Sequence, residues 1–172
     1  FSEDPAKIER VEKIGKELAA IANANQVRVT FGDPRLSVFP YQFKVVQGKD
    51  VNAFSIPGGY IYIYEGLLDF AESDDEVAGV VAHEISHAAF RHLAVMRRKS
   101  EKIDLLQIPL IIAAIMTRSP EAMIGLQGVN LAGRAFQSGW SLDAELSADL
   151  GAMQYMVQSS YNPLGVLTFM ER

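Results

Sequence analysis

The chain has 172 residues, and 49% of them are hydrophobic. It can therefore bury a core, which excludes a disordered chain, and we expect residues 1–172 to form a single domain that continues beyond Arg172 in the natural protein. The net charge of −5 and the lack of a basic patch argue against nucleic acid as a partner. No cysteine is present, which excludes disulfides and thiolate ligands and leaves His, Asp and Glu to bind a metal.

The first part of the chain predicts one helix and then a small sheet. Asp4-Pro5 is typical of a helix start, and apolar residues recur at three- and four-residue steps as far as Ile21. Alternation over residues 27–31 predicts a half-buried strand, and residues 41–46 a second one. Residues 51–56 and 60–64 predict two strands around a glycine turn. The tyrosines of residues 60–64 either face solvent or substrate, or pack across the sheet.

The second part is mostly helical. Residues 66–70 predict a short helix, and Ser73 with Glu76 is a capping box that starts a helix over residues 74–97. The apolar residues 103–116 are too short to span a membrane; they are buried, lie over a cleft or touch a membrane surface. Further helices are predicted over residues 119–137, residues 142–158 behind Ser141, and after Asn162-Pro163. The fold class is α+β, mostly helical.

The motif His83-Glu84-Ile85-Ser86-His87 lies in the first long helix of this part. Positions four apart share a helix face, so His83 and His87 present their imidazoles side by side, which suits two ligands of one zinc ion. Glu84 is placed to take a proton from a metal-activated water and to return it to the leaving group. The motif therefore predicts a zinc-dependent hydrolase.

A hydrolytic zinc site needs a third protein ligand. Glu145, on a separate predicted helix, is the best candidate, because Asp149 follows it four residues later on the same face and could hold a ligand histidine in its tautomer. Asp143, Asp69 and Glu72 are weaker candidates, since none of them has a paired acid at helical spacing.

His92 is the third and last histidine of the chain. In a continuous helix it lies about 900° of rotation after His83, on the opposite face, so we expect a structural role for it. Arg91 either faces the cleft or pairs with an acid. A donor to the oxyanion is needed as well, for which a tyrosine or Arg134 is a candidate.

Five segments of the chain form a recognisable series: Asn52-Ala53-Phe54, Pro57-Gly58-Gly59-Tyr60-Ile61-Tyr62, Gly66-Leu67-Leu68, Asp75 through His87, and Glu145-Leu146-Ser147-Ala148-Asp149. In order and wording they resemble the M48 family of zinc metallopeptidases, which includes CAAX prenyl proteases, HtpX-type and OMA1-type membrane proteases, and periplasmic members. The resemblance extends from about Val11 to the C-terminus, with Ser86 where many members have glycine.

The resemblance implies that His83, His87 and Glu145 bind one zinc ion, that Glu84 is the catalytic acid/base, and that Asp149 is the acid after the third ligand. It implies a gluzincin-like zincin core, with a small antiparallel or mixed sheet packed on the active-site helix. An extended polypeptide substrate would add to the sheet edge, at residues 52–54 or 60–62.

Because membrane spans of the integral members are missing, the resemblance is closest to the bacterial envelope branch, in the periplasm or cell envelope. It implies a zinc metalloendopeptidase for the quality control of misfolded or unassembled envelope proteins. The alternative is a latent or non-proteolytic zinc-containing chaperone or assembly module. In a third hypothesis, the apolar residues 105–116 make peripheral membrane contact and proteolysis is secondary.

Overall fold

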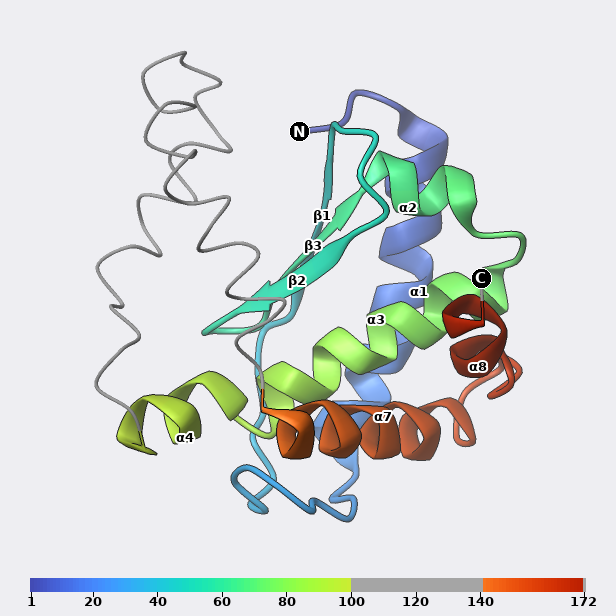
Figure 1. Cartoon of the computed structure of the whole chain (residues 1–172). Helices are drawn as coiled ribbons and strands as arrows, with labels where there is room; N and C mark the ends of the chain where they lie inside the picture. The colour runs from blue at the N-terminus through green and yellow to red at the C-terminus, as the bar shows by residue number, and fades with distance from the viewer. Residues whose placement is uncertain (100–140, 172) are drawn as a thin grey trace, which may run out of the picture.

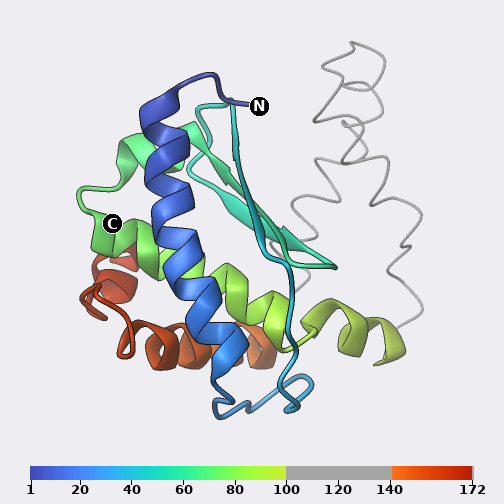
Figure 2. The same ribbon diagram turned by 180° about the vertical axis from the view of Figure 1, so that it is seen from behind.

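The computed structural model describes residues 1–99 and 141–171 (Figures 1 and 2). The helices expected over residues 103–116 and 119–137 lie outside these residues, as does Arg134. Among the helices described, none is long and apolar enough to cross a membrane. The elements in chain order are α1 (Pro5–Ala24), β1 (Gln42–Val46), β2 (Ala53–Ile56), β3 (Tyr60–Tyr64), α2 (Glu65–Phe70), α3 (Asp74–Ala89), α4 (His92–Lys99), α7 (Leu142–Met156) and α8 (Gly165–Met170).

The sheet is small and mixed, as predicted. Its strand order is β1-β3-β2, with β1 parallel and β2 antiparallel to β3. Gly58 and Gly59 both have positive φ and form the turn between β2 and β3, a backbone geometry that favours glycine. Tyr62 is buried and stacks on Phe54 with ring centroids 4.9 Å apart, whereas Tyr60 is exposed. Cross-strand packing therefore describes Tyr62.

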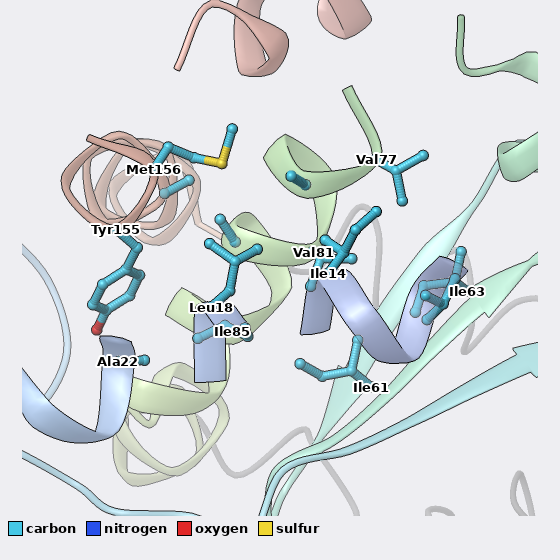
Figure 3. Close-up of a cluster of buried hydrophobic side chains, with 14 of the residues drawn as sticks. Ile14, Leu18, Ala22, Ile61, Ile63, Val77, Val81, Ile85, Tyr155 and Met156 are labelled. Atoms are coloured by element: carbon cyan, nitrogen blue, oxygen red, sulfur yellow. The ribbon is translucent and has the colours of Figure 1, made fainter. Parts of the chain in front are cut away.

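Helix α3 lies at the centre of the molecule. The sheet and α1 pack on one side of it, and α7 and α8 pack on the other (Figures 1 and 2). Apolar side chains from all of these layers meet around it, and burying them removes apolar surface from water, which stabilises the layers together. The labelled core side chains of Figure 3 are Ile14, Leu18, Ala22, Ile61, Ile63, Val77, Val81, Ile85, Tyr155 and Met156.

Three helix starts follow the predicted capping. Asp4 accepts hydrogen bonds from the first backbone N–H groups of α1, and Ser141 does the same for α7. The Ser73 hydroxyl accepts from the Glu76 N–H at the start of α3, but the Glu76 carboxylate accepts from the Glu72 N–H instead of completing a capping box. Each cap satisfies backbone donors that a helix leaves unpaired, and so sets the start of the helices that carry the polar site.

The strand predicted over residues 27–31 is wrong. The segment is extended and its burial alternates, but it is hydrogen-bonded to side chains of α7 rather than to a strand. Gln154 bonds the N–H and the carbonyl of Arg28, and Ser147 does the same for Phe31. Alternation identified the buried face correctly, but strand pairing depends on which backbone lies alongside, and here it is a helix.

The continuous helix predicted over residues 74–97 is also wrong, because it breaks after Ala89. Arg91 has a φ of 51°, in the left-handed region, and the Phe90 carbonyl accepts from the N–H of Asp33 instead of continuing the helix. Helix α4 then starts at His92 in a new direction (Figure 1). The turn therefore changes which face of the helix pair His92 occupies.

Candidate metal centre

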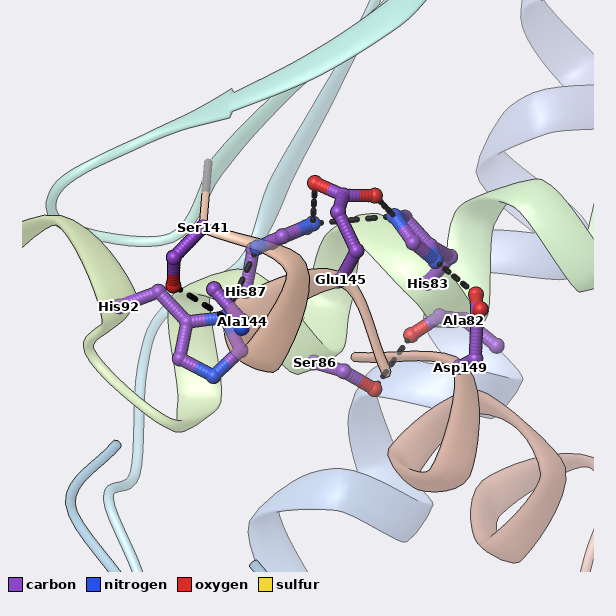
Figure 4. Close-up of polar contacts among 9 residues, drawn as sticks. All are labelled: Ala82, His83, Ser86, His87, His92, Ser141, Ala144, Glu145 and Asp149. Carbon is purple, nitrogen blue, oxygen red and sulfur yellow. Dashed lines mark hydrogen bonds and ion pairs between the residues drawn. The ribbon is translucent and has the colours of Figure 1, made fainter. Parts of the chain in front are cut away.

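Three side chains from two helices converge where α3 packs against α7 (Figure 4). His83 and His87 come from α3 and Glu145 from the first turn of α7, and one donor atom of each lies within 4.8 Å of the others. The two Nε2 atoms are 2.9 Å apart. The Glu145 carboxylate lies 3.4 Å from Nε2 of His83 and 3.6 Å from Nε2 of His87.

The donor set fits a zinc ion. Two imidazole nitrogens and one carboxylate are the ligands of a three-ligand hydrolytic site, which keeps one position open. Tetrahedral zinc with ligands at about 2.0–2.1 Å places ligand atoms about 3.3 Å from each other. The two separations that involve Glu145 are close to this value, and the histidine pair needs to open by only a few tenths of an ångström.

His83 is held by acids on two sides. Its Nδ1 lies 2.9 Å from Oδ1 of Asp149, and its Nε2 faces Glu145. Burial opposes the charged form of the ring, but the hydrogen bonds to Asp149 and Glu145 prevail and raise the pKa of His83 to about 10. In the metal-free protein His83 therefore carries a proton on each nitrogen at neutral pH, and a metal would displace the proton on Nε2.

His87 lies deeper and has no carboxylate on its outer nitrogen. Its Nδ1 lies 2.8 Å from Nδ1 of His92, and its side chain is only 2% exposed. Burial lowers the pKa of His87, and the neighbouring rings of His83 and His92 lower it further. The ring is therefore neutral, which is the form that binds a metal.

Glu84 follows His83 on α3 and lies against strand β2. Burial raises the pKa of its carboxyl group, while the charge of His83 and hydrogen bonds from the side chain and backbone of Ser55 act in the opposite direction. A raised pKa makes the carboxylate a stronger base, which favours the proton transfers that a general acid/base performs.

Close packing of α3 on α7 brings the two parts of the centre together. A Cβ at Gly151 would lie 2.6 Å from the Phe90 ring and from the Ser86 hydroxyl, so only glycine fits there. Ser86 is fully buried and donates to the Ala82 carbonyl. A serine in place of the family's glycine is thus accommodated by a hydrogen bond within its own helix.

The weaker ligand candidates lie outside the group of three. Asp69 pairs with Lys7 at 2.6 Å. Arg91 donates to the Ser37 hydroxyl at 3.0 Å, and its guanidinium group lies over the Phe39 ring. These contacts are with a hydroxyl and an aromatic ring and not with an acid.

The substrate-strand candidates Asn52, Ala53 and Phe54 lie at and just before the start of β2. The Asn52 carbonyl accepts from the N–H of Tyr64. In the described sheet, β2 pairs with β3 alone, so its other edge carries no described strand, and the same strand contacts α3. Residues 60–62 belong to β3, which is the central strand, and they are therefore unsuitable for strand addition.

Two features of this centre were missed in the sequence. His92 was expected on the opposite face from His83, but the turn at Arg91 returns its ring to His87. Ser55 was not singled out as a contact of Glu84, although it lies one residue after the predicted substrate strand. The sequence carries no local signal for the turn, since neither glycine nor proline stands at residues 89–92.

The pattern of donors agrees with the comparison to known proteins. The model of peptidase family M48 matches residues 5–170, almost the whole chain. The chain belongs to peptidase family M48. Its membership places the three donor residues in a family of metallopeptidases, for which a metal cofactor is expected.

The chain is similar to bacterial proteases over most of its length. It is 28% identical over 172 residues to the beta-barrel assembly-enhancing protease of Yersinia pestis, 98% of this chain and 33% of that protein. It is 30% identical to metalloprotease LoiP of Escherichia coli (91% and 58%) and 32% identical to metalloprotease YcaL (80% and 50%). The chain thus spans between one third and three fifths of the length of these M48 relatives.

Proposed function

We propose that this chain is the catalytic part of a zinc-dependent metalloendopeptidase. The observation that carries the proposal is the convergence of His83, His87 and Glu145 to within 4.8 Å in a member of family M48. Glu84 lies beside the same cluster. A hydrolytic zinc site requires three protein ligands, a nearby base and a fourth position that is open to water. This chain supplies the three ligands and the base.

Each side chain of the metal centre has a separate role in the proposed hydrolysis. Zinc, when bound, activates a water and polarises the peptide carbonyl. His83, His87 and Glu145 hold the ion. Asp149 fixes the Nδ1–H of His83, a role that usually changes metal affinity about 10- to 100-fold. Glu84 accepts the proton of the water, guided by Ser55, and returns it to the leaving amine.

The substrate class is a polypeptide in an extended conformation. Strand β2 has an edge that carries no described strand, and it contacts the helix that holds the histidines. Backbone pairing of a substrate with Ala53 and Phe54 would then carry its scissile bond toward Glu84. The core would correspond to a gluzincin-like zincin core.

The cell envelope is the proposed setting. Relatives that cover almost the whole chain are named for the assembly of beta-barrels. Misfolded or unassembled envelope proteins are then the natural polypeptide substrates, and the enzyme works in the periplasm. The rival function, a latent or non-proteolytic zinc module of the envelope, predicts zinc without peptide hydrolysis. Membrane-surface contact by residues 105–116 is a third candidate, supported only by their apolar composition.

The decisive experiment compares the wild type with Glu84→Gln. We expect Glu84→Gln to keep about one zinc per chain by metal analysis and to lose hydrolysis of an unfolded protein substrate, since only the proton transfer is removed. Asp143→Ala, an exposed acid on α7, is the matched control and retains both. Full hydrolysis in Glu84→Gln would remove Glu84 from the mechanism. Zinc with no hydrolysis in the wild type would favour the latent module.

A further inference from the structure

We propose that His92 is a positioning residue, which holds His87 in the tautomer whose free nitrogen faces the metal centre. Its consequence for zinc binding rests on the proposed function, and its basis is the set of contacts that His92 makes in the structure. His92 is fully buried and lies behind His87, away from Glu145, and is not one of the three grouped donors. Its two ring nitrogens contact two different partners.

The first contact is with a backbone carbonyl. Nε2 of His92 lies 2.9 Å from the Phe31 carbonyl oxygen, which can only accept a hydrogen bond. His92 must therefore carry its proton on Nε2, because a lone pair there would face the oxygen lone pairs at 2.9 Å. A neutral ring with its proton on Nε2 presents a lone pair on Nδ1.

The second contact transmits that choice. Nδ1 of His92 lies 2.8 Å from Nδ1 of His87. Since His92 accepts there, His87 must donate, and its proton is on Nδ1. Its Nε2 is then free of a proton, and it lies 2.9 Å from Nε2 of His83, toward the other donors. The unprotonated Nε2 of His87, which is the atom that can bind a metal, therefore faces the metal centre. The Phe31 carbonyl fixes this tautomer through His92.

The segment around Phe31 is itself held against α7. The Ser147 hydroxyl donates to the Phe31 carbonyl at 2.9 Å and accepts from the Phe31 N–H at 3.1 Å. Gly32 next to it has a φ of 115°, and a Cβ there would lie 2.5 Å from the Phe90 carbonyl and 2.9 Å from the ring of His92. These contacts pack Phe31 and His92 against α7 and the end of α3. We call the hydrogen-bonded series from the Phe31 carbonyl through His92 to His87 the relay.

The test uses a pair of variants of nearly equal shape. His92→Asn keeps an acceptor near the position of Nδ1. His92→Leu has nearly the same shape as the asparagine variant but has no acceptor. Phe31 still has the donor Ser147 in both. Leu93→Ala is the control for lost stability, because it shortens a buried side chain of the same helix that takes no part in the hydrogen bonds between Phe31, His92 and His87. All are compared with the wild type at matched fraction folded.

The first measurement is the tautomer state of each ring in the metal-free protein, by long-range 1H–15N correlation spectra. We expect His87 protonated on Nδ1 and His92 on Nε2 in the wild type, and the His87 signal to lose this preference in His92→Leu but keep it in His92→Asn. His87 protonated on Nε2 in the wild type, or unchanged signals in His92→Leu, would overturn the proposal.

The second measurement is zinc affinity by competition with a chromophoric chelator. We expect His92→Leu to bind zinc about 10- to 100-fold more weakly and His92→Asn within about threefold of the wild type, as loss of an outer partner does. Equal weakening in both variants would overturn the proposal. If the wild type bound no zinc while its His87 tautomer depended on His92, the proposed function would fail and the positioning role would still stand.

Discussion

The two histidines of the motif are one helical turn apart on α3, but their outer nitrogens meet opposite partners. The His83 side is electrostatic: Asp149 and Glu145 face the ring from α7, and they raise the pKa of His83 to about 10. The His87 side is neutral: it contacts His92, and both rings have pKa values lowered by burial. One helix face therefore holds one ligand by charge and the other by hydrogen-bond direction.

A short motif therefore specifies the candidate ligands but not how each one is oriented. The charged side depends on a helix pair, α3 and α7, and the neutral side depends on a turn and a loop. Substitutions can therefore remove the partner of one histidine and leave the partner of the other in place. Zinc affinity measures the effect of each substitution.

The largest effect is expected where the two sides share a ligand. Glu145→Ala should lower the affinity for zinc by about two orders of magnitude or more, because it removes one of the three protein ligands and leaves only the two histidines. Zinc content by metal analysis, with a circular dichroism check on folding, measures this. Asp143→Ala, on the same helix but exposed, controls for general change in charge. Retained zinc in Glu145→Ala would place the third ligand elsewhere.

Next comes the electrostatic side. Asp149→Ala should weaken zinc binding about 10- to 100-fold, and Asp149→Asn less, because an amide oxygen still accepts the Nδ1–H of His83. A chelator competition assay compares both with the wild type. Affinity unchanged in Asp149→Ala would show that His83 is oriented without its partner, and the comparison drawn above would fail.

The pH dependence of the metal-free protein tests the charges on both sides. His83 has its pKa raised from 6.5 to about 10, so the stability it contributes is complete below pH 6.5 and lost as pH rises toward 10. His92 has its pKa lowered to about 4, and that of His87 is lowered as well, so stability falls as pH falls below 6.5. We expect a maximum near pH 6.5, and the raised pKa of the Glu84 carboxyl offsets part of the fall that the two histidines cause on the acid side.

Urea unfolding between pH 4.5 and 9.5, in the presence of a chelator, measures this curve. Zinc should abolish the alkaline limb, because it replaces the proton on His83. A curve that rises steadily from pH 5 to pH 9 would show that the His83 pKa is not raised, and that the electrostatic side is weaker than its geometry indicates.

The smallest effect concerns the backbone that supports the neutral side. Ser147→Ala removes a hydrogen bond in each direction with Phe31, which we expect to cost about 1 kcal/mol of stability in denaturant unfolding and leave zinc affinity within about threefold. Gln154→Ala, which removes the equivalent bonds at Arg28, is the matched control and should lower stability similarly without reaching the relay. A loss of zinc affinity in Ser147→Ala alone would place Ser147 inside the relay.

Local patterns predicted much of the fold, because each depends on a few neighbouring residues. The start of α1 at Asp4, the Ser73 cap of α3 and the Ser141 cap of α7 follow from side chains that accept the first N–H groups of a helix. The strands around Gly58-Gly59 and the parallel strand β1 were expected within a residue or two at most of their boundaries. Expected donors lie together because the motif spacing and the E-x-x-x-D spacing each place two groups on one helix face.

Two predictions failed where the chain meets distant parts of itself. Residues 27–31 alternate as a strand would, but they lie along α7, and Gln154 and Ser147 take the hydrogen bonds. His92 was expected across the helix from His83, but Arg91 takes a left-handed conformation and the Phe90 carbonyl bonds to Asp33. Neither contact has a local pattern, since both partners are far apart in the sequence.

By itself, the sequence determined the ligand candidates, the acid beside them and the helix faces they occupy, because periodicity and side-chain chemistry are properties of short segments. Only the tertiary structure decided how His87 is oriented. That orientation depends on Phe31 and His92, which a break in the helix brings to His87, and the free energy of such contacts depends on distances that no short segment contains.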